Sequence, residues 1–171
     1  MKIILKKLNL THATQKYLKW LNNYNVVKFT DQIFKQYSLK LLKKYILNLN
    51  KSKFNFLYGI FIVTEKKQIH IGNIKIGDIN YYHRTAMVSL LIGESKYWKK
   101  GIATKSINLV KKIAKNKLSL YKLYAGCYKE NIASQKAFLK NKYKKEGVQK
   151  NQIIVGNKRS DLIWYGLVLK K

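Results

Sequence analysis

The sequence predicts an α/β fold of the α+β type, with seven strands and four helices in one domain that spans residues 1–171. Two apolar stretches, Phe54–Thr64 and Gln68–Gly77, flank a short polar turn, as the strands of a hairpin do. Further along, an apolar run at 86–93 leads through a glycine-containing turn into residues 102–117, where apolar side chains recur at helical spacing. Hairpins combined with strand–turn–helix units indicate a sheet covered by helices.

The chain before the hairpin contains one candidate strand and two candidate helices. Lys2–Lys7 alternates weakly between polar and apolar residues, which is consistent with a first strand. Thr11 is a candidate N-cap for the first helix, and Ser38 is the N-cap expected for the second. The passage between these helices, Val26–Gln36, is irregular and rich in aromatic side chains.

The C-terminal part contains three further candidate strands and one helix. Tyr121–Tyr128 is a plausible strand, and a helix begins at Ile132. Gly147–Val155 and Asp161–Leu169 form a closing strand pair that turns at Gly156-Asn157-Lys158. The chain contains no proline, no low-complexity linker and no internal repeat, which favours a single compact domain.

The charge balance is strongly basic, with 36 Lys and Arg against 7 Asp and Glu and a net charge of +29. Such a balance favours non-specific binding to polyanions such as nucleic acid. The lysines are spread along the whole chain, and Asn, Ile and Tyr are also abundant, which indicates the amino-acid bias of an AT-rich genome. Arginine, the preferred reader of base edges, occurs only as Arg84 and Arg159.

Several classes of protein are disfavoured by composition. The longest apolar run, Leu57–Val63, is far shorter than the ~20 residues that span a bilayer. The start of the chain has too few apolar residues for a signal peptide, so we expect a cytoplasmic protein. The single cysteine, Cys127, excludes an internal disulfide and is expected to pack in a strand. No cluster of His, Cys and carboxylates has metal-ligand spacing, so no metal is expected.

The turn before residue 102 has the character of a phosphate site. Gly101 and Ala103 are small enough to let an anion approach the backbone at the N-terminus of the helix. Lys99, Lys100 and Lys105 add positive charge. The turn has neither the Gly-Lys pair of a P-loop nor the three glycines of a Rossmann fingerprint.

Two motifs on either side of the Tyr121–Tyr128 strand resemble those of the GCN5-related N-acetyltransferases (GNAT). The first reads Trp98-Lys-Lys-Gly-Ile-Ala103, with Trp98 at a position that is Gln or Arg in the family. The second reads Asn131-Ile-Ala-Ser-Gln-Lys-Ala-Phe138. Tyr143-Lys-Lys-Glu-Gly147 and His70-Ile-Gly-Asn-Ile74 resemble the branch that contains ribosomal-protein and amino-sugar acetyltransferases. The resemblance implies a GNAT fold, with a central mixed, mostly antiparallel twisted sheet of six to seven strands and about four flanking helices.

The resemblance also implies acetyl-coenzyme A (acetyl-CoA) as the donor of an acetyl group to an amine. Its diphosphate would lie on the turn before the helix, its pantetheine arm along the 86–93 strand and beside Asn131, and its adenosine phosphates near Lys136. Asn131 is also a good N-cap, and both roles are compatible. The residues expected to hold the cofactor are Leu91, Ile92, Gly93, Lys99, Lys100, Gly101, Ile102, Ala103, Thr104, Asn131, Lys136 and Phe138.

Acetyl transfer requires an uncharged amine, so a group must accept a proton from the ammonium form. Glu94 is the first candidate for this base, acting through water, because it follows the 86–93 strand; it is also a candidate turn cap. His83, in the polar loop Asp78–Thr85, is the second candidate, and Asp78 is the third. The backbone N–H of Ile92 is expected to hold the oxyanion.

Many relatives are thought to protonate the departing sulfur with a tyrosine at the position of Phe138, which has no proton to give. Either Tyr143 or water substitutes, or the thiolate leaves unassisted. The helices between the first two strands would form one wall of the acceptor site, with Tyr24, Phe29 and Tyr37 as candidate lining residues and His83 opposite.

The acceptor is expected to be an amino sugar carried on a nucleotide or the N-terminus of a protein, and the enzyme a monomer or homodimer. The alternative is a polyanion-binding module that keeps the fold without turnover.

Overall fold

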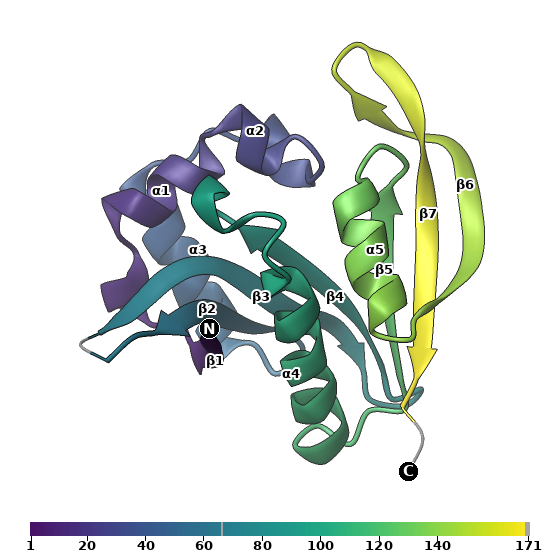
Figure 1. The fold of residues 1–171 in the computed structure, drawn as a ribbon, viewed down its shortest axis with the longest axis horizontal. Helices are drawn as coiled ribbons and strands as arrows, with labels where there is room; N and C mark the ends of the chain where they lie inside the picture. The colour runs from purple at the N-terminus through teal and green to yellow at the C-terminus, as the bar shows by residue number, and fades with distance from the viewer. Residues whose placement is uncertain (66, 170–171) are drawn as a thin grey trace.

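A computed structural model describes residues 1–65 and 67–169. Its described residues form one seven-stranded sheet in the order β1-β2-β3-β4-β5-β7-β6 (Figure 1). The strands are β1 (Lys2–Lys7), β2 (Phe56–Val63), β3 (Gln68–Asn80), β4 (Thr85–Ile92), β5 (Lys122–Tyr128), β6 (Lys144–Val155) and β7 (Lys158–Val168). The α-helices are α1 (Gln15–Leu21), α2 (Tyr24–Val27), α3 (Leu39–Lys51), α4 (Ile102–Asn116) and α5 (Ile132–Lys140). Three short 3-10 helices are η1 (Leu10–His12), η2 (Asp31–Phe34) and η3 (Ser95–Tyr97).

All neighbouring strands pair antiparallel except β4 and β5, which run parallel. Their pairing is short and joins only Thr85–Met87 to Lys122–Tyr124. Beyond these residues the two strands diverge (Figure 1). The sheet is therefore mixed and mostly antiparallel, as predicted, and it opens between its two central strands.

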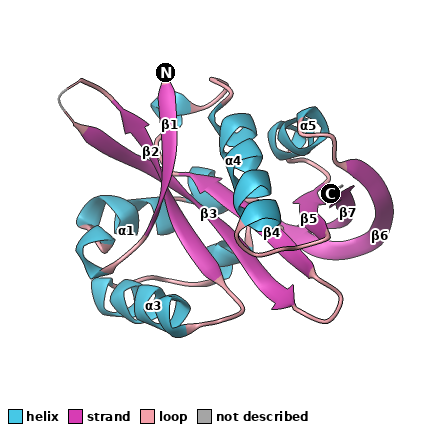
Figure 2. Cartoon of the chain, turned by 90° about the horizontal axis from the view of Figure 1, so that it is seen from below, coloured by secondary structure: helices cyan, strands magenta, loops and turns pink. Residues whose placement is uncertain are grey.

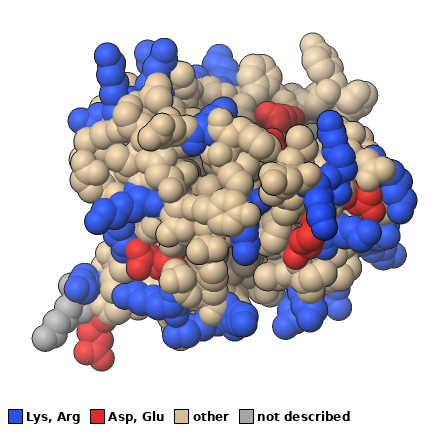
Figure 3. All heavy atoms as spheres, turned by 90° about the horizontal axis from the view of Figure 1, so that it is seen from above, with Lys and Arg blue, Asp and Glu red and all other residues tan. Residues whose placement is uncertain are grey.

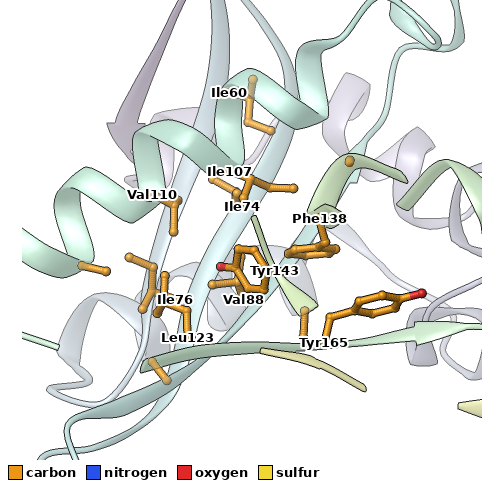
Figure 4. Close-up of a cluster of buried hydrophobic side chains, with 14 of the residues drawn as sticks. Ile60, Ile74, Ile76, Val88, Ile107, Val110, Leu123, Phe138, Tyr143 and Tyr165 are labelled. Carbon is orange, nitrogen blue, oxygen red and sulfur yellow. The ribbon is translucent and has the colours of Figure 1, made fainter. Parts of the chain in front are cut away.

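Helices cover both faces of the sheet. α4 and α5 lie on one face, and α1 and α3 lie on the other (Figure 2). The face under α4 and α5 has the larger core, in which Ile74, Ile76 and Val88 of the sheet pack against Ile107 and Val110 of α4 (Figure 4). A second core joins α1 and α3 to β2 on the opposite face.

Side-chain caps fix where the helices begin. The Ser38 side chain accepts from the N–H of Leu41, as the sequence predicts for the helix before β2. The predicted cap at Thr11 is wrong, because Thr11 lies inside η1 and α1 begins after Thr14. The irregular passage Val26–Gln36 contains the end of the short helix α2 and all of η2, which carry no periodic apolar pattern.

The closing hairpin is longer than predicted. β6 begins at Lys144 and β7 at Lys158, and the pair turns at Gly156. Two register shifts interrupt the pairing, and the second leaves three residues of β6 without a partner between Gln149 and Ile153. Such bulges bend a strand and increase its twist. The tip of the hairpin therefore projects beyond the sheet (Figure 1).

Candidate active site

A cleft of about 650 Å³ lies where β4 and β5 diverge. Its walls come from the second half of β4, the end of β5, the first turns of α5, the α2–η2 segment and the tip of the β6–β7 hairpin. Figure 3 views the molecule from the side on which α2 and the hairpin tip lie; uncharged residues fill the middle of this face, and lysines surround them. The cleft is therefore a hollow with few charges in a strongly basic surface.

The edge of β4 that borders the opening carries unpaired backbone groups. Gly93 N–H donates to Ile71 O of β3 at 2.9 Å, so every second residue before it also turns its backbone toward β3. Leu90 and Ile92 must then point their N–H and C=O groups away from β3, toward the opening. The Ile92 carbonyl accepts from the indole Nε1–H of Trp98 at 2.8 Å, which agrees with this direction.

This bond gives Trp98 a structural role, although Trp98 departs from the Gln or Arg of the motif that the sequence resembles. Trp98 ties the turn before α4 to the end of β4. It occupies the position where Gln or Arg is usual, and its indole bonds the carbonyl of Ile92 rather than the N–H.

The turn before α4 is built as an anion cradle. Gly101 caps α4 in the left-handed conformation, with φ +73°, and a Cβ placed there would meet no atom within 4 Å. The first helical bond is donated by Lys105 N–H to Gly101 O. Within residues 1–65 and 67–169, the N–H groups of Gly101 to Thr104 have no acceptor. Four free donors at a helix N-terminus form a site suited to phosphate.

The start of α5 forms the opposite wall of the opening. Asn131 lines the cleft. Its side chain also accepts from Ser134 N–H at 3.2 Å, so the same residue caps the helix. Phe138 also lines the cleft. Lys136 is exposed and lies outside the residues that line it.

The predicted acid Tyr143 is placed in the core instead. It is 2% exposed, contacts Phe138 edge-to-face and directs its hydroxyl away from that ring into the apolar cluster (Figure 4). The hydroxyl has no hydrogen-bond partner in the described chain, and burial raises its pKa. Tyr143 does not line the cleft, so of the three alternatives for the departing sulfur the geometry does not support Tyr143.

The Glu94 side chain contacts α1, which does not fit its predicted role as general base. Its Oε1 accepts from the indole N–H of Trp20 at 3.0 Å and lies 3.4 Å from Lys16 Nζ. Glu94 is absent from the residues that line the cleft. Its carboxylate therefore holds α1 against the end of β4, and the geometry does not support a role as general base.

His83 and Asp78 lie at the other end of the strands. His83 is exposed in the β3–β4 turn, before the first residue of β4, while the cleft borders the second half of that strand. At ~3.3 Å per residue, a strand of this length separates the two ends by roughly 20 Å. Asp78 is exposed next to the same turn. Neither lines the cleft, so the geometry does not support their assignment as bases or that of His83 as a substrate contact.

Asp31 is the acid that sequence reasoning missed. Among the cleft-lining residues of the described chain it is the only carboxylate. It accepts from the Tyr128 hydroxyl at 2.9 Å, and burial together with this bond raises the pKa of Tyr128. Asp31 begins η2 after the capping residue Thr30, in a passage without periodicity. Only the fold brings it opposite β5.

Two of the three aromatic residues expected in the acceptor wall line the cleft. Phe29 and Tyr37 line the cleft, and Phe29 lies 6.3 Å from Tyr128, centroid to centroid. Tyr24 is exposed on α2 and does not reach it. Two cations, Lys75 and Arg159, also line the cleft.

No group of three or more His, Cys, Asp and Glu side chains in the described residues is arranged to hold a metal ion. None of the helices in that part of the chain has the length and apolar character needed to cross a membrane.

Solved structures share this fold at low sequence identity. Spermidine N-acetyltransferase from Vibrio cholerae in complex with CoA and spermine matches with a TM-score of 0.87 and 18% identity, covering 98% of this chain and 95% of that one. A dodecameric structure of the same enzyme in an intermediate state matches with a TM-score of 0.80 and 19% identity, covering 98% and 94%. A domain from Methanocaldococcus jannaschii matches with a TM-score of 0.78 and 21% identity, covering 98% and 99%. No curated protein sequence matches the chain.

A family model settles the relationship that the two motifs indicated. The model of the acetyltransferase (GNAT) domain matches residues 2–144, which include the diverging strands, the glycine turn and the capped helix α5. This match confirms the predicted acetyltransferase activity and its donor, acetyl-CoA. The chain belongs to the GNAT acetyltransferase family.

Proposed function

We propose that this N-acetyltransferase acetylates a primary amine bound in the cleft, with acetyl-CoA lying across the opening between β4 and β5. The observation that carries the proposal is the combination of a strand edge at Leu90 and Ile92 that faces away from β3 with free amides at Gly101 to Thr104. The first suits an extended amide-containing arm, and the second suits a diphosphate. Leu90 lines the cleft, and the glycine turn follows the same strand, β4, along the chain.

Free backbone donors and open space in the turn before α4 support acetyl-CoA as the bound donor. Four donors are free in the turn before α4, and no side chain occupies the space beside Gly101. Lys99, Lys100, Ile102 and Ala103 complete that turn, while Leu91, Gly93 and Asn131 border the strand edge. When bound, the cofactor supplies an acetyl group activated as a thioester. The Ile92 N–H faces the opening and is the donor we assign to the developing oxyanion.

Asp31 is the residue we assign to the amine. One of its carboxylate oxygens accepts from Tyr128, and the other remains available to an ammonium group. A primary amine titrates near ~10, as lysine does, and must lose a proton before it can attack. The Asp31 carboxylate is placed to hold the ammonium and to receive that proton, directly or through water. With Tyr143 in the core, water is the donor we assign to the departing sulfur.

The charges of the cleft favour an acceptor with one positive charge over a polycation. Spermine, bound by the Vibrio enzyme, carries several ammonium groups, and one carboxylate beside Lys75 and Arg159 is a poor match for it. An amine on a neutral or anionic body, such as a nucleotide-linked amino sugar or a protein N-terminus, suits this balance better. Binding of polyanions without turnover, the alternative, is supported by the net charge of +29, by Phe138 and by the scarcity of acids in the cleft.

The first prediction tests Asp31 by thiol release from acetyl-CoA in the presence of amines. We expect Asp31→Asn to lower kcat/KM by about 100-fold or more, since general base catalysis contributes roughly 10² to 10⁴. Its affinity for acetyl-CoA should stay within about twofold, because Asp31 lies away from the glycine turn. Asp78→Asn makes the same substitution at an exposed acid and should match the parent.

The variant Glu94→Gln distinguishes Glu94 from Asp31 as the general base. It keeps an oxygen for the Trp20 bond, so we expect a small change in turnover and an unchanged pH–rate profile. A loss with Glu94→Gln as large as with Asp31→Asn would contradict the assignment. Absence of thiol release with every amine, together with absence of acetyl-CoA binding, would overturn the proposed function.

A further inference from the structure

Asn73 is a buried amide that is only half satisfied. It lies in the middle of β3, is 5% exposed, and belongs to the residues that line the cleft. Its Oδ1 accepts from the Nε2–H of His70 at 2.9 Å. Its Nδ2 has no partner in the described chain. A buried donor left unpaired destabilises the folded state, so such a group calls for an explanation.

A rigid surrounding holds the ring that bonds the amide of Asn73. The ring of His70 stacks on Phe61 with centroids 4.8 Å apart and meets Trp20 edge-to-face at 5.0 Å. Burial lowers the pKa of His70 to about 4, so the ring is neutral at pH 7 and carries a single N–H. That N–H is given to Asn73 Oδ1, which leaves the Nδ2 group as the end without a protein partner.

The free donor lies next to the reacting end of the site. Asn73 pairs directly with Leu91 of β4, so the two side chains share the face covered by α1 and α3. Leu90 and Ile92, whose backbone groups face the opening, flank Leu91 on either side. Lys75 and Ser89, the next pair on the same face, line the cleft as well. A molecule that presents its amine here passes beside Asn73.

We infer that Asn73 donates a hydrogen bond from Nδ2 to an oxygen of the acceptor molecule and so selects amines that carry an oxygen near the reacting nitrogen. This inference rests on the proposed function. A hydroxyl, ring or carbonyl oxygen can accept that bond, whereas a protonated polyamine offers only donors and methylene groups. A site with a buried donor rejects ligands that leave it unpaired. Asn73 is thus a specificity-determining residue for amino sugars or peptide N-termini over polyamines.

The second prediction compares two kinds of acceptor with the parent, Asn73→Asp and Asn73→Leu. Glucosamine and a tripeptide with a free N-terminus carry oxygens near the amine; cadaverine and spermine carry none. The parent should prefer the oxygen-bearing amines. Both variants should lower kcat/KM for those amines by about tenfold or more, as loss of one buried hydrogen bond predicts, without lowering it for the oxygen-free amines.

A structural role would affect both kinds of acceptor equally, and that result would overturn the inference. So would a parent that acetylates cadaverine as well as glucosamine. Asn48→Asp, on the exposed side of α3, is the matched control and should leave all four acceptors unchanged. Acetyl-CoA affinity of the variants should stay within about twofold of the parent.

A second readout uses the folded parent alone. The side-chain amide resonance of Asn73 should shift on addition of glucosamine to the CoA-bound protein and should not shift with cadaverine. An unchanged resonance at saturating glucosamine, while thiol release proceeds, would contradict the contact. If no amine releases thiol and no acetyl-CoA binds, the proposed function fails, and the inference fails with it.

Discussion

His70 is buried among aromatic rings and is the residue with the clearest acid–base consequence. Burial lowers its pKa from 6.5 to about 4, and the hydrogen bond to Asn73 opposes this only in part. His12 and Lys16 lie near it and add positive charge that lowers the pKa further. The folded state therefore binds a proton at His70 less readily than the unfolded chain does.

The third prediction follows from this difference in proton binding. Because the folded pKa is depressed, the contribution of His70 is fully present above pH 6.5 and is lost as pH falls toward 4. The loss amounts to at most about 3 kcal/mol, at ~1.4 kcal/mol per pKa unit. Urea unfolding of the parent should show this fall, and His70→Gln should show less of it over the same range.

The exposed His83 provides the control, since His83→Gln should keep the pH dependence of the parent. Equal slopes for His70→Gln and the parent between pH 6.5 and 4 would mean that His70 is not held neutral.

Single residues were predicted well where local backbone chemistry decides their role. Gly101 and Asn131 lie where their turn and cap require, since a left-handed turn and a helix N-cap are local features. Glu94 was assigned by its distance along the chain from a strand, and its side chain turned to Trp20 instead. Asp31 could not be found in this way, because its position opposite β5 depends on how the α2–η2 segment packs.

At the scale of elements, the end of β4 is fixed by its contact with α1. A Cβ placed on Gly93 would lie 2.0 Å from Trp20 Cδ2, because the indole ring covers the backbone there. The same ring donates to Glu94 and packs on His70. One close contact therefore connects the strand that borders the cleft to the aromatic cluster that orients Asn73.

The fourth prediction concerns Gly93→Ala. The methyl group would displace the Trp20 ring, and overpacking of this kind costs about 1–3 kcal/mol of unfolding free energy. Gly147→Ala is the matched control, since a Cβ there meets nothing within 4 Å. Urea midpoints measured side by side should fall for Gly93→Ala alone. Equal midpoints would show that Trp20 does not pack on Gly93 in solution.

Elements were predictable where hydrophobic periodicity and caps act within one segment. All seven strands and the helices α1, α3, α4 and α5 fall close to their expected ranges. The divergence of β4 from β5 could not be read from either strand alone, because pairing that stops after Met87 depends on contacts between distant segments. The bulges of β6 were missed for the same reason, since neither strand of the hairpin shows where its partner skips residues.

At the scale of the whole molecule, positive charge is spread over the surface, whereas the free backbone donors lie together at one turn. Lysines surround the face in Figure 3, while the cleft beneath is lined by one acid, two cations and many uncharged residues. A uniform basic surface attracts any polyanion and weakens with salt. The glycine turn instead offers directed donors at one point. The contributions of the basic surface and of the glycine turn to anion binding can be separated, because only that of the turn depends on the backbone conformation.

The fifth prediction uses two glycines with the same conformation. Gly101 and Gly156 both have positive φ, and a Cβ on either meets no atom within 4 Å. Gly101→Glu and Gly156→Glu therefore impose similar backbone strain and change the net charge equally. Only Gly101→Glu places a carboxylate in front of the free amides of α4.

Calorimetric titration with acetyl-CoA at low and high salt is the measurement that tests the anion cradle most directly. The parent and Gly156→Glu should bind with affinities within about twofold of each other at each salt concentration. Gly101→Glu should lose at least about tenfold in affinity, as expected when charge-assisted hydrogen bonds to the diphosphate are blocked. Equal affinity for the two variants would contradict the account, because the phosphates would then be held by the lysine surface alone.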